Sequence, residues 1–287
     1  MHTYRFSNTV RPDETLRGSF NALTRATFGF DFTAWYAAGH WGDLYIPHVL
    51  ADENTVISNV SVNHMVFDLD GVRKHYLQLG TVMTHTSYRN QGLNRQIMEH
   101  ILREYADQVD GIYLFGNDSV LDYYPKFGFR PALETEYYLP ADRFGLPYAV
   151  EPAQPEEFYG AVKQNSSNPN DAFYMCENLG LYQFWCGAEF EDNVYFIPQA
   201  KAYVIAVKEG GRVYIHQIIG QEKVDLSRLA ASFGADVTEA VFGFTPADRH
   251  TFPSRPHKEK DSTLFLLGKD LDRIEQEGLI FPTLSHA

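Results

Sequence analysis

The stretch LQLGTVMTHTSYRNQGLNRQIMEHILRE, residues 77–104, decides the fold predicted for this chain. It begins as an apolar strand that ends at Thr84, passes through a polar turn and opens an amphipathic helix at Gly92. The first N–H groups of a helix lack partners and lie at the positive end of its dipole. A glycine there lets a phosphate approach the bare amides, and Arg89 can fork onto phosphate oxygens. The stretch therefore predicts an anion-binding helix start.

The residues on both sides of this turn predict a sheet. Three strands separated by turns are expected upstream, with Asp70 and Gly71 in a tight hairpin that tolerates positive φ: Tyr45–Ala51, Thr55–Phe67 and Val72–Thr84. Downstream, an apolar stripe repeats every four residues along the helix: Leu93, Ile97, Ile101 and Tyr105. Gly111–Gly116 is then expected as a buried strand parallel to Val72–Thr84, which completes a strand, helix, strand unit.

The N-terminal region adds a helix and a group of aromatic residues. A helix is expected over Pro12–Thr27, followed by an aromatic segment over Phe30–Trp41. Trp35, Tyr36 and Trp41 either pack in the core or in a lid, or wall a substrate cleft. The sequence leaves both interpretations open.

A second motif lies about 35 residues further on, where Tyr123–Phe129 holds an aromatic residue, a tyrosine, three residues, a glycine and a phenylalanine. Together with Arg89, two residues, Gly92, one residue and Asn94, it resembles the GNAT N-acetyltransferase superfamily over residues 1–145. The family pattern has glycine or alanine where Asn94 stands. Its side chain could crowd a pyrophosphate or bond to it.

The resemblance implies acetyl-CoA as acyl donor, with no metal and no covalent intermediate. The backbone of the strand end would hold the pantetheine and polarise the thioester carbonyl, and the turn amides would cradle the pyrophosphate. The implied cofactor contacts are Val82, Met83, Thr84, Arg89, Asn90, Gln91, Gly92, Leu93, Asn94 and Asn117. Tyr124 is the implied general acid for the departing thiolate.

The general base is not decided by the sequence. A lysine-like amine has a pKa of about 10.4 and must lose a proton before it attacks. Candidates near the two motifs, each with a surface or structural role as the alternative, are His75, Tyr76, Gln78, Asp118 and Asp122. In two-domain GNAT enzymes of the enhanced-intracellular-survival type, the terminal carboxylate is the base. Here the carboxylate of Ala287 is a hypothesis, and packing of the tail is its alternative.

The second half of the chain is expected to repeat the order of the first half. Arg130–Leu139 is predicted to close the first sheet, and a proline-containing linker follows it. Predicted helices are Glu156–Gln164, Ala172–Phe190 and Val224–Phe233, and predicted strands are Val194–Ile197, Ala202–Val207, Val213–Ile219, Val237–Phe244 and Thr263–Leu267. The helix entry at Gly220–Lys223 lacks the arginine and glycine spacing. We therefore predict residues 1–145 as the catalytic domain and 146–287 as a degenerate GNAT-like domain that shapes the acceptor site or a homodimer contact.

Composition narrows the class of protein. The 287 residues are 44% hydrophobic and 15% aromatic, which indicates a folded chain, and no apolar run reaches the length of a membrane helix. A net charge of −13 argues against nucleic acid and favours cationic substrates. Cys176 and Cys186 have no second pair for a zinc site and are expected to be buried. The polar first ten residues do not resemble a signal peptide, so a cytoplasmic protein is expected.

The sequence thus predicts a mixed α/β (α+β) fold: a mostly antiparallel sheet flanked by helices, followed by a second GNAT-like α/β domain. The predicted activity is N-acyl transfer, with acetyl as the expected group, from acyl-CoA to a primary amine of a small molecule or peptide. A CoA-binding sensor or interaction module without turnover is the alternative. A purely structural partner protein is a third hypothesis.

Overall fold

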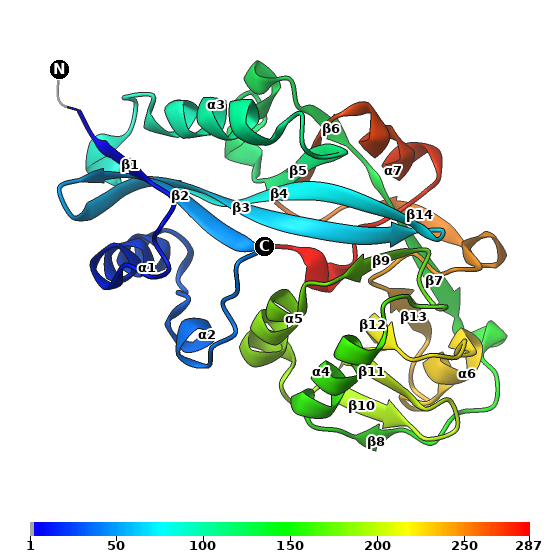
Figure 1. Cartoon of the computed structure of the whole chain (residues 1–287). Coiled ribbons are helices and arrows are strands. Elements are labelled where there is room, and N and C mark those ends of the chain that lie inside the picture. Colours follow the sequence, from blue (N-terminus) through cyan, green and yellow to red (C-terminus); the bar gives the residue numbers. More distant parts are fainter. Residues whose placement is uncertain (1–2) are drawn as a thin grey trace.

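Two twisted sheets with helices against their faces make up residues 3–287, the part of the chain described by the computed structural model (Figure 1). The helices are α1 (Glu14–Phe28), α2 (Thr33–Ala37), α3 (Leu93–Tyr105), α4 (Pro155–Gln164), α5 (Leu179–Trp185), α6 (Leu226–Ala231) and α7 (Arg273–Gln276). The strands are β1 (Arg5–Ser7), β2 (Tyr45–Asp52), β3 (Thr55–Leu69), β4 (Val72–Thr84), β5 (Gly111–Gly116), β6 (Arg130–Ala132), β7 (Glu134–Pro140), β8 (Glu151–Pro152), β9 (Phe173–Cys176), β10 (Val194–Ile197), β11 (Ala202–Glu209), β12 (Arg212–Ile219), β13 (Glu239–Phe242), β14 (Ser254–His257) and β15 (Thr263–Leu267).

The first sheet has the predicted antiparallel meander at its centre. Its order is β1-β2-β3-β4-β5-β15-β6. Strand β9 pairs with the C-terminal end of β3, from Val66 to Leu69. The turn between β3 and β4 has positive φ at both Asp70 (49°) and Gly71 (85°), as the Asp-Gly pair predicts. β4 and β5 are parallel, with α3 as the crossover between them. The mixed α/β, mostly antiparallel fold class is therefore confirmed.

Helix α3 covers one face of this sheet with its apolar stripe. Leu93, Ile97 and Ile101 are buried against Leu77 and Leu79 of β4, whereas Tyr105 is only partly buried at the end of the helix. This packing fixes the position of α3 relative to the end of β4, and therefore the position of the turn from His85 to Gln91 that joins them.

The N-terminal aromatic residues form a core on the opposite face. Trp35 and Trp41 are buried and stack with ring centroids 5.6 Å apart. Tyr36 instead lies at the surface, where the Arg17 guanidinium sits 3.8 Å from its ring centroid. Of the two interpretations, core packing accounts for Trp35 and Trp41.

The predicted closing strand Arg130–Leu139 is wrong as a single strand. It divides at Leu133 into β6, which pairs with β15 in the first sheet, and β7, which pairs with β13 and β14 in the second. Thr263–Leu267, predicted for the second half, is β15 and pairs with β5. Consecutive residues Leu264, Phe265 and Leu266 are buried, so β15 is covered on both faces. Such an apolar strand is compatible with the centre of either sheet, and the sequence pattern therefore predicts a strand without indicating which strands it pairs with. The division of the chain at residue 145 stays a prediction. The two sheets exchange strands, since β7 lies in the second sheet and β15 in the first.

The predicted helix Ala172–Phe190 is also wrong in its first part. Phe173–Cys176 forms β9, and helix α5 begins only after Asn178, whose side chain accepts a hydrogen bond from Leu181 N (3.2 Å). A short apolar run cannot be assigned to strand or helix from periodicity alone. The α5 helix continues as a π-helical turn to Phe190. Between β5 and β6 the chain forms two 3-10 turns, Asp118–Val120 and Tyr124–Phe127.

The second sheet repeats part of the pattern of the first. Its order is β14-β7-β13-β12-β11-β10-β8, with β10, β11 and β12 antiparallel and β12 parallel to β13. The C-terminal segment passes between the two sheets, where Phe281 stacks on Tyr113 with centroids 3.9 Å apart. In Figure 1 this red segment ends between the first sheet and α5. No helix in the described residues is long and apolar enough to cross a membrane.

Candidate active site

Strands β4 and β5 separate at the place where the sequence predicts the thioester. In the described chain their parallel pairing runs from Tyr76 and Gly111 to Leu79 and Leu114, although β4 continues to Thr84 and β5 to Gly116. Just beyond, Thr81 has a φ of 46° and the register of β4 against β3 shifts. The ends of β4 and β5 beyond Leu79 and Leu114 are therefore not paired with each other, and we call the region between these two ends the V-shaped opening.

The predicted pyrophosphate turn follows the end of β4. It contains a 3-10 turn at Thr86–Tyr88, and Asn90 and Gly92 have positive φ values of 62° and 73°. Gly92 is the N-cap of α3 and makes no side-chain cap, so the first amides of this helix have no side-chain acceptor from the cap. Gln91 and Gly92 are exposed. The turn therefore presents bare amides to the outside, as an anion site requires.

Arg89 and Asn94 take different places around this turn. Arg89 is exposed, donates from Nε to the Thr84 carbonyl at 3.4 Å and forms no ion pair among residues 3–287. Asn94 points back to the strand, where its Nδ2 donates to Met83 O (3.2 Å) and to Thr84 Oγ1 (2.7 Å). The side chain that departs from the family pattern thus ties the helix to the strand end.

Asn117 and Tyr124 lie beyond the end of β5, on the other arm of the opening. The Asn117 side chain accepts a hydrogen bond from Ser119 N at 3.0 Å and so caps the first 3-10 turn. Tyr124 is buried against Phe265, and a Cβ atom on Gly116 would come 2.8 Å from its ring. Its hydroxyl forms no hydrogen bond with the described residues. Burial raises the pKa of Tyr124 well above its ordinary value, so the hydroxyl keeps its proton at neutral pH.

The base candidates named from sequence are scattered. His75 lies near the start of β4, far from Thr84 along the strand, and Tyr76 donates to Asp270 Oδ2 at 2.6 Å. Asp118 and Asp122 are exposed residues near the 3-10 turns. Gln78 is buried two residues from Gly80, with its Oε1 unpartnered in the described chain. The structure does not bring these five together.

The C-terminal segment reaches the V-shaped opening. The main chain of Ala287 contacts the position of Gly80, the residue before the bulge, and Ala287 itself is exposed. The His286 ring stacks on Phe115 of β5 with centroids 4.1 Å apart. Its carbonyl accepts a hydrogen bond from Trp185 Nε1 at 2.8 Å. Sequence reasoning raised the tail as a hypothesis but missed Phe115 and Trp185, because they belong to segments far apart in the chain.

The equivalent opening in the second sheet is filled. β12 and β13 are paired as far as Ile215 and Phe242, and the residue that follows β13, Gly243, lies against Thr283 of the tail. Thr283 N donates to Gly243 O at 2.8 Å. The following helix, α6, is capped by the Asp225 carboxylate, which accepts from Ser227 N at 2.9 Å. The start of α6 is therefore already capped by a carboxylate, whereas the start of α3 in the first half has no side-chain cap.

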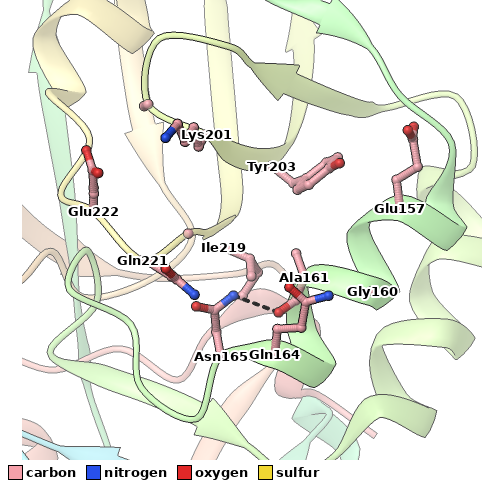
Figure 2. Close-up of a pocket in the computed structure, with 12 residues that line it drawn as sticks. Glu157, Gly160, Ala161, Gln164, Asn165, Lys201, Tyr203, Ile219, Gln221 and Glu222 are labelled. Carbon is pink, nitrogen blue, oxygen red and sulfur yellow. Dashed lines mark hydrogen bonds between the residues drawn. The ribbon is translucent and has the colours of Figure 1, made fainter.

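A separate pocket of about 360 Å³ lies between α4 and the end of β12 (Figure 2). Figure 2 shows that Lys201, Tyr203 and Glu222 edge it, while Asn165 bonds back to the Ala161 carbonyl at 2.7 Å. None of its lining residues belongs to the predicted site. Residues 3–287 hold no cluster of three or more His, Cys, Asp or Glu side chains that could bind a metal.

The mixed α/β fold, with β4 and β5 parallel and α3 between them, is the fold expected from the two sequence motifs. Residues 10–132 match the family model described as an acetyltransferase (GNAT) domain. A search of curated proteins finds no match.

Solved structures extend the likeness of fold to most of the chain. A conserved protein of unknown function from Enterococcus faecalis V583, described as a probable N-acyltransferase, is 16% identical. The match covers 93% of this chain and 71% of that one, with a TM-score of 0.61. A GCN5-related N-acetyltransferase from Kribbella flavida is 14% identical (94% and 72% covered, TM-score 0.59). Eis1 from Mycobacterium abscessus is 13% identical (92% and 73%, TM-score 0.59).

Proposed function

We propose that this protein transfers an acyl group, with acetyl as the expected one, from acyl-CoA directly to a primary amine. The observation that carries the proposal is the opening between β4 and β5, which has an uncapped helix start on one arm and a buried tyrosine on the other. The match of residues 10–132 to the acetyltransferase (GNAT) domain model supports the same reaction class.

The residues present fit the phosphate part of acyl-CoA. The exposed turn offers the amides at the start of α3 and the Arg89 guanidinium, which forms no ion pair among residues 3–287. Amides and arginine together bind a pyrophosphate through charge-assisted hydrogen bonds. The free backbone side of β4 beyond Leu79 would hold the pantetheine and polarise the thioester carbonyl.

The chemistry needs an acid and a base. The amine nitrogen forms a bond to the thioester carbon, the carbon–sulfur bond breaks, and the amine gives up a proton. Tyr124, whose hydroxyl stays protonated, would supply the proton to sulfur. When Ala287 is the free terminus, its carboxylate beside Gly80 would accept the amine proton. The pKa of His286 is lowered to about 4 by burial, so its ring is uncharged at neutral pH.

Transfer of a radiolabelled acetyl group to a panel of polyamines, aminoglycosides, amino acids and peptide N-termini tests the proposal. Binding of acetyl-CoA in calorimetry without transfer to any amine would favour the sensor instead. Absence of CoA binding would refute both and leave the structural-partner hypothesis. Extending the chain past Ala287 by a few residues tests the base, because the packing of Ser285 and His286 is kept while the carboxylate moves. Deletion of Ser285–Ala287 is the companion variant, and both should lower kcat without weakening CoA binding.

A further inference from the structure

The surface beside the end of the tail is built from aromatic rings. Trp185 donates to the His286 carbonyl, and the next ring is Phe184, 5.6 Å from Trp185 between centroids. Phe184 packs in turn against Phe30 at 6.1 Å, and Phe30 against Phe28 at 6.1 Å. These four rings, Trp185, Phe184, Phe30 and Phe28, form a continuous series that we call the aromatic wall.

Exposure increases along the aromatic wall away from Ala287. Trp185 and Phe184 are partly buried, whereas Phe30 and Phe28 are 42% and 45% exposed. Single exposed apolar side chains are common, but a contiguous series that joins solvent to a proposed reaction centre indicates a binding surface. The neighbouring rings Phe32 and Trp35 are buried, and Phe30 packs on Phe32 with centroids 5.5 Å apart, so the wall continues the aromatic core outward to solvent.

The carboxylate next to Phe30 in the chain is not free to bind a polycation. Asp31, between Phe30 and Phe32 in the chain, is ion-paired with Arg25, so its charge is already compensated. A polyamine or aminoglycoside presents several cations that need carboxylate partners at spaced positions. Aromatic rings instead pack against flat apolar groups, in offset or edge-to-face contact, and tolerate one cation over a ring face.

We propose that the acceptor is a primary amine that carries an aromatic or other flat apolar group, packed along the aromatic wall with its nitrogen toward Ala287. This inference rests on the proposed function and names the substrate class of the same site. The rings orient the acceptor, and none of them enters the bond changes.

The test compares acetyl transfer to 2-phenylethylamine and to 2-aminoethanol. Both are primary amines on a two-carbon chain, and the first carries a phenyl group where the second carries a hydroxyl. Burial of a phenyl group predicts a kcat/KM about tenfold or more higher for 2-phenylethylamine. Phe30→Ala should lower kcat/KM for 2-phenylethylamine about tenfold, mainly through KM, and change that for 2-aminoethanol less than about twofold. Phe184→Leu keeps the site filled and should act in the same direction. Phe6→Ala is the control, because Phe6 is an exposed ring of β1 that packs on His100 of α3.

Equal kcat/KM for the two amines, or an equal loss for both in Phe30→Ala, would overturn the aromatic acceptor while leaving acyl transfer in place. Absence of transfer to every amine despite CoA binding would overturn the proposed function and this inference with it. A preference for 2-phenylethylamine that disappears in Phe30→Ala and persists in Phe6→Ala is the expected result.

Discussion

The main chain of Ala287 lies against Gly80, so close that a Cβ atom on Gly80 would come 2.8 Å from the Ala287 carbonyl carbon. Only glycine allows such an approach of two backbones. Because Gly80 directly precedes the bulge beyond which β4 and β5 are not paired, the end of the tail is set beside the proposed reaction centre. The Phe115 and Trp185 contacts to His286 hold it there.

Substitution of Gly80 by alanine should displace the tail and slow turnover. We expect Gly80→Ala to lower kcat about tenfold or more, since a positioned base contributes about 100-fold or more. Acetyl-CoA affinity should change little, because the turn at Arg89 is not touched. Steady-state kinetics and calorimetry measure the two effects. Gly18→Ala is the matched control, since a Cβ atom at Gly18 in α1 would meet nothing within 4 Å; wild-type kcat in Gly80→Ala would contradict a role for the tail.

Arg89→Ala should weaken acetyl-CoA binding, because it removes a cation from the exposed turn before α3. Loss of one charge-assisted hydrogen bond of about 1.5–3 kcal/mol corresponds to an affinity about 10- to 100-fold lower. The control is Arg95→Ala, which removes another exposed arginine that pairs with Glu99 at 2.8 Å. Calorimetry at two salt concentrations should show a smaller salt dependence for Arg89→Ala than for Arg95→Ala. Equal affinities in the two variants would remove Arg89 from the site.

The part of the fold that follows local patterns could be predicted from the sequence. The hairpin at Asp70–Gly71, the stripe of α3 and the parallel strand β5 each depend on residues close together in the chain, and the structure confirms them. The exchange of β7 and β15 between the sheets could not be predicted, because a strand buried on both faces does not specify its neighbour.

The candidate site likewise has one part that the sequence predicts and one part that it does not. The turn around Arg89 and Gly92 lies in one short segment, so spacing alone located it. The surroundings of Ala287 come from β4, β5 and α5, which are separated by long stretches of sequence. Nothing in the local pattern of Phe184 and Trp185 distinguishes a wall beside the tail from ordinary core packing.

Tyr124→Phe should leave acetyl-CoA affinity unchanged and lower kcat, by about 100-fold or more if protonation of sulfur limits the chemical step. The ring would keep its packing on Gly116 and Phe265, so only the proton donor is lost. Tyr123→Phe is the adjacent control, since the Tyr123 hydroxyl is buried without a partner in the described chain and its removal costs little. Single-turnover kinetics isolates the chemical step. An unchanged single-turnover rate would exclude Tyr124 as the acid.

Calorimetry should find one CoA site per chain. In the second half, Thr283 occupies the place beside Gly243 and the Asp225 carboxylate caps α6, so an approaching pyrophosphate would meet an occupied opening and a like charge. Arg89→Ala should therefore reduce the single binding event rather than one of two. A second site of comparable affinity that survives in Arg89→Ala would contradict this account of the second half.

The stability of the protein should fall as pH rises from about 4.5 to 7, in part because of Glu134. This carboxyl is buried between the sheets, where desolvation raises its pKa to about 7 although Phe281 N donates to it at 2.8 Å. In that pH window the folded chain holds a proton that the unfolded chain has released. The folded state therefore loses stability with rising pH, by roughly 3 kcal/mol for a pKa raised from 4.5 to about 7 at 1.36 kcal/mol per pKa unit.

Glu134→Gln removes the titrating carboxyl group and keeps a side-chain oxygen that can accept the hydrogen bond from Phe281 N. Urea unfolding at pH 5 and pH 8 should show the variant gaining stability relative to the parent as pH rises, since only the parent must bury a charge at pH 8. Glu209→Gln, at the exposed hairpin between β11 and β12, should follow the parent at both pH values. Parallel pH profiles for Glu134→Gln and the parent would mean that Glu134 titrates alike in the folded and unfolded chains.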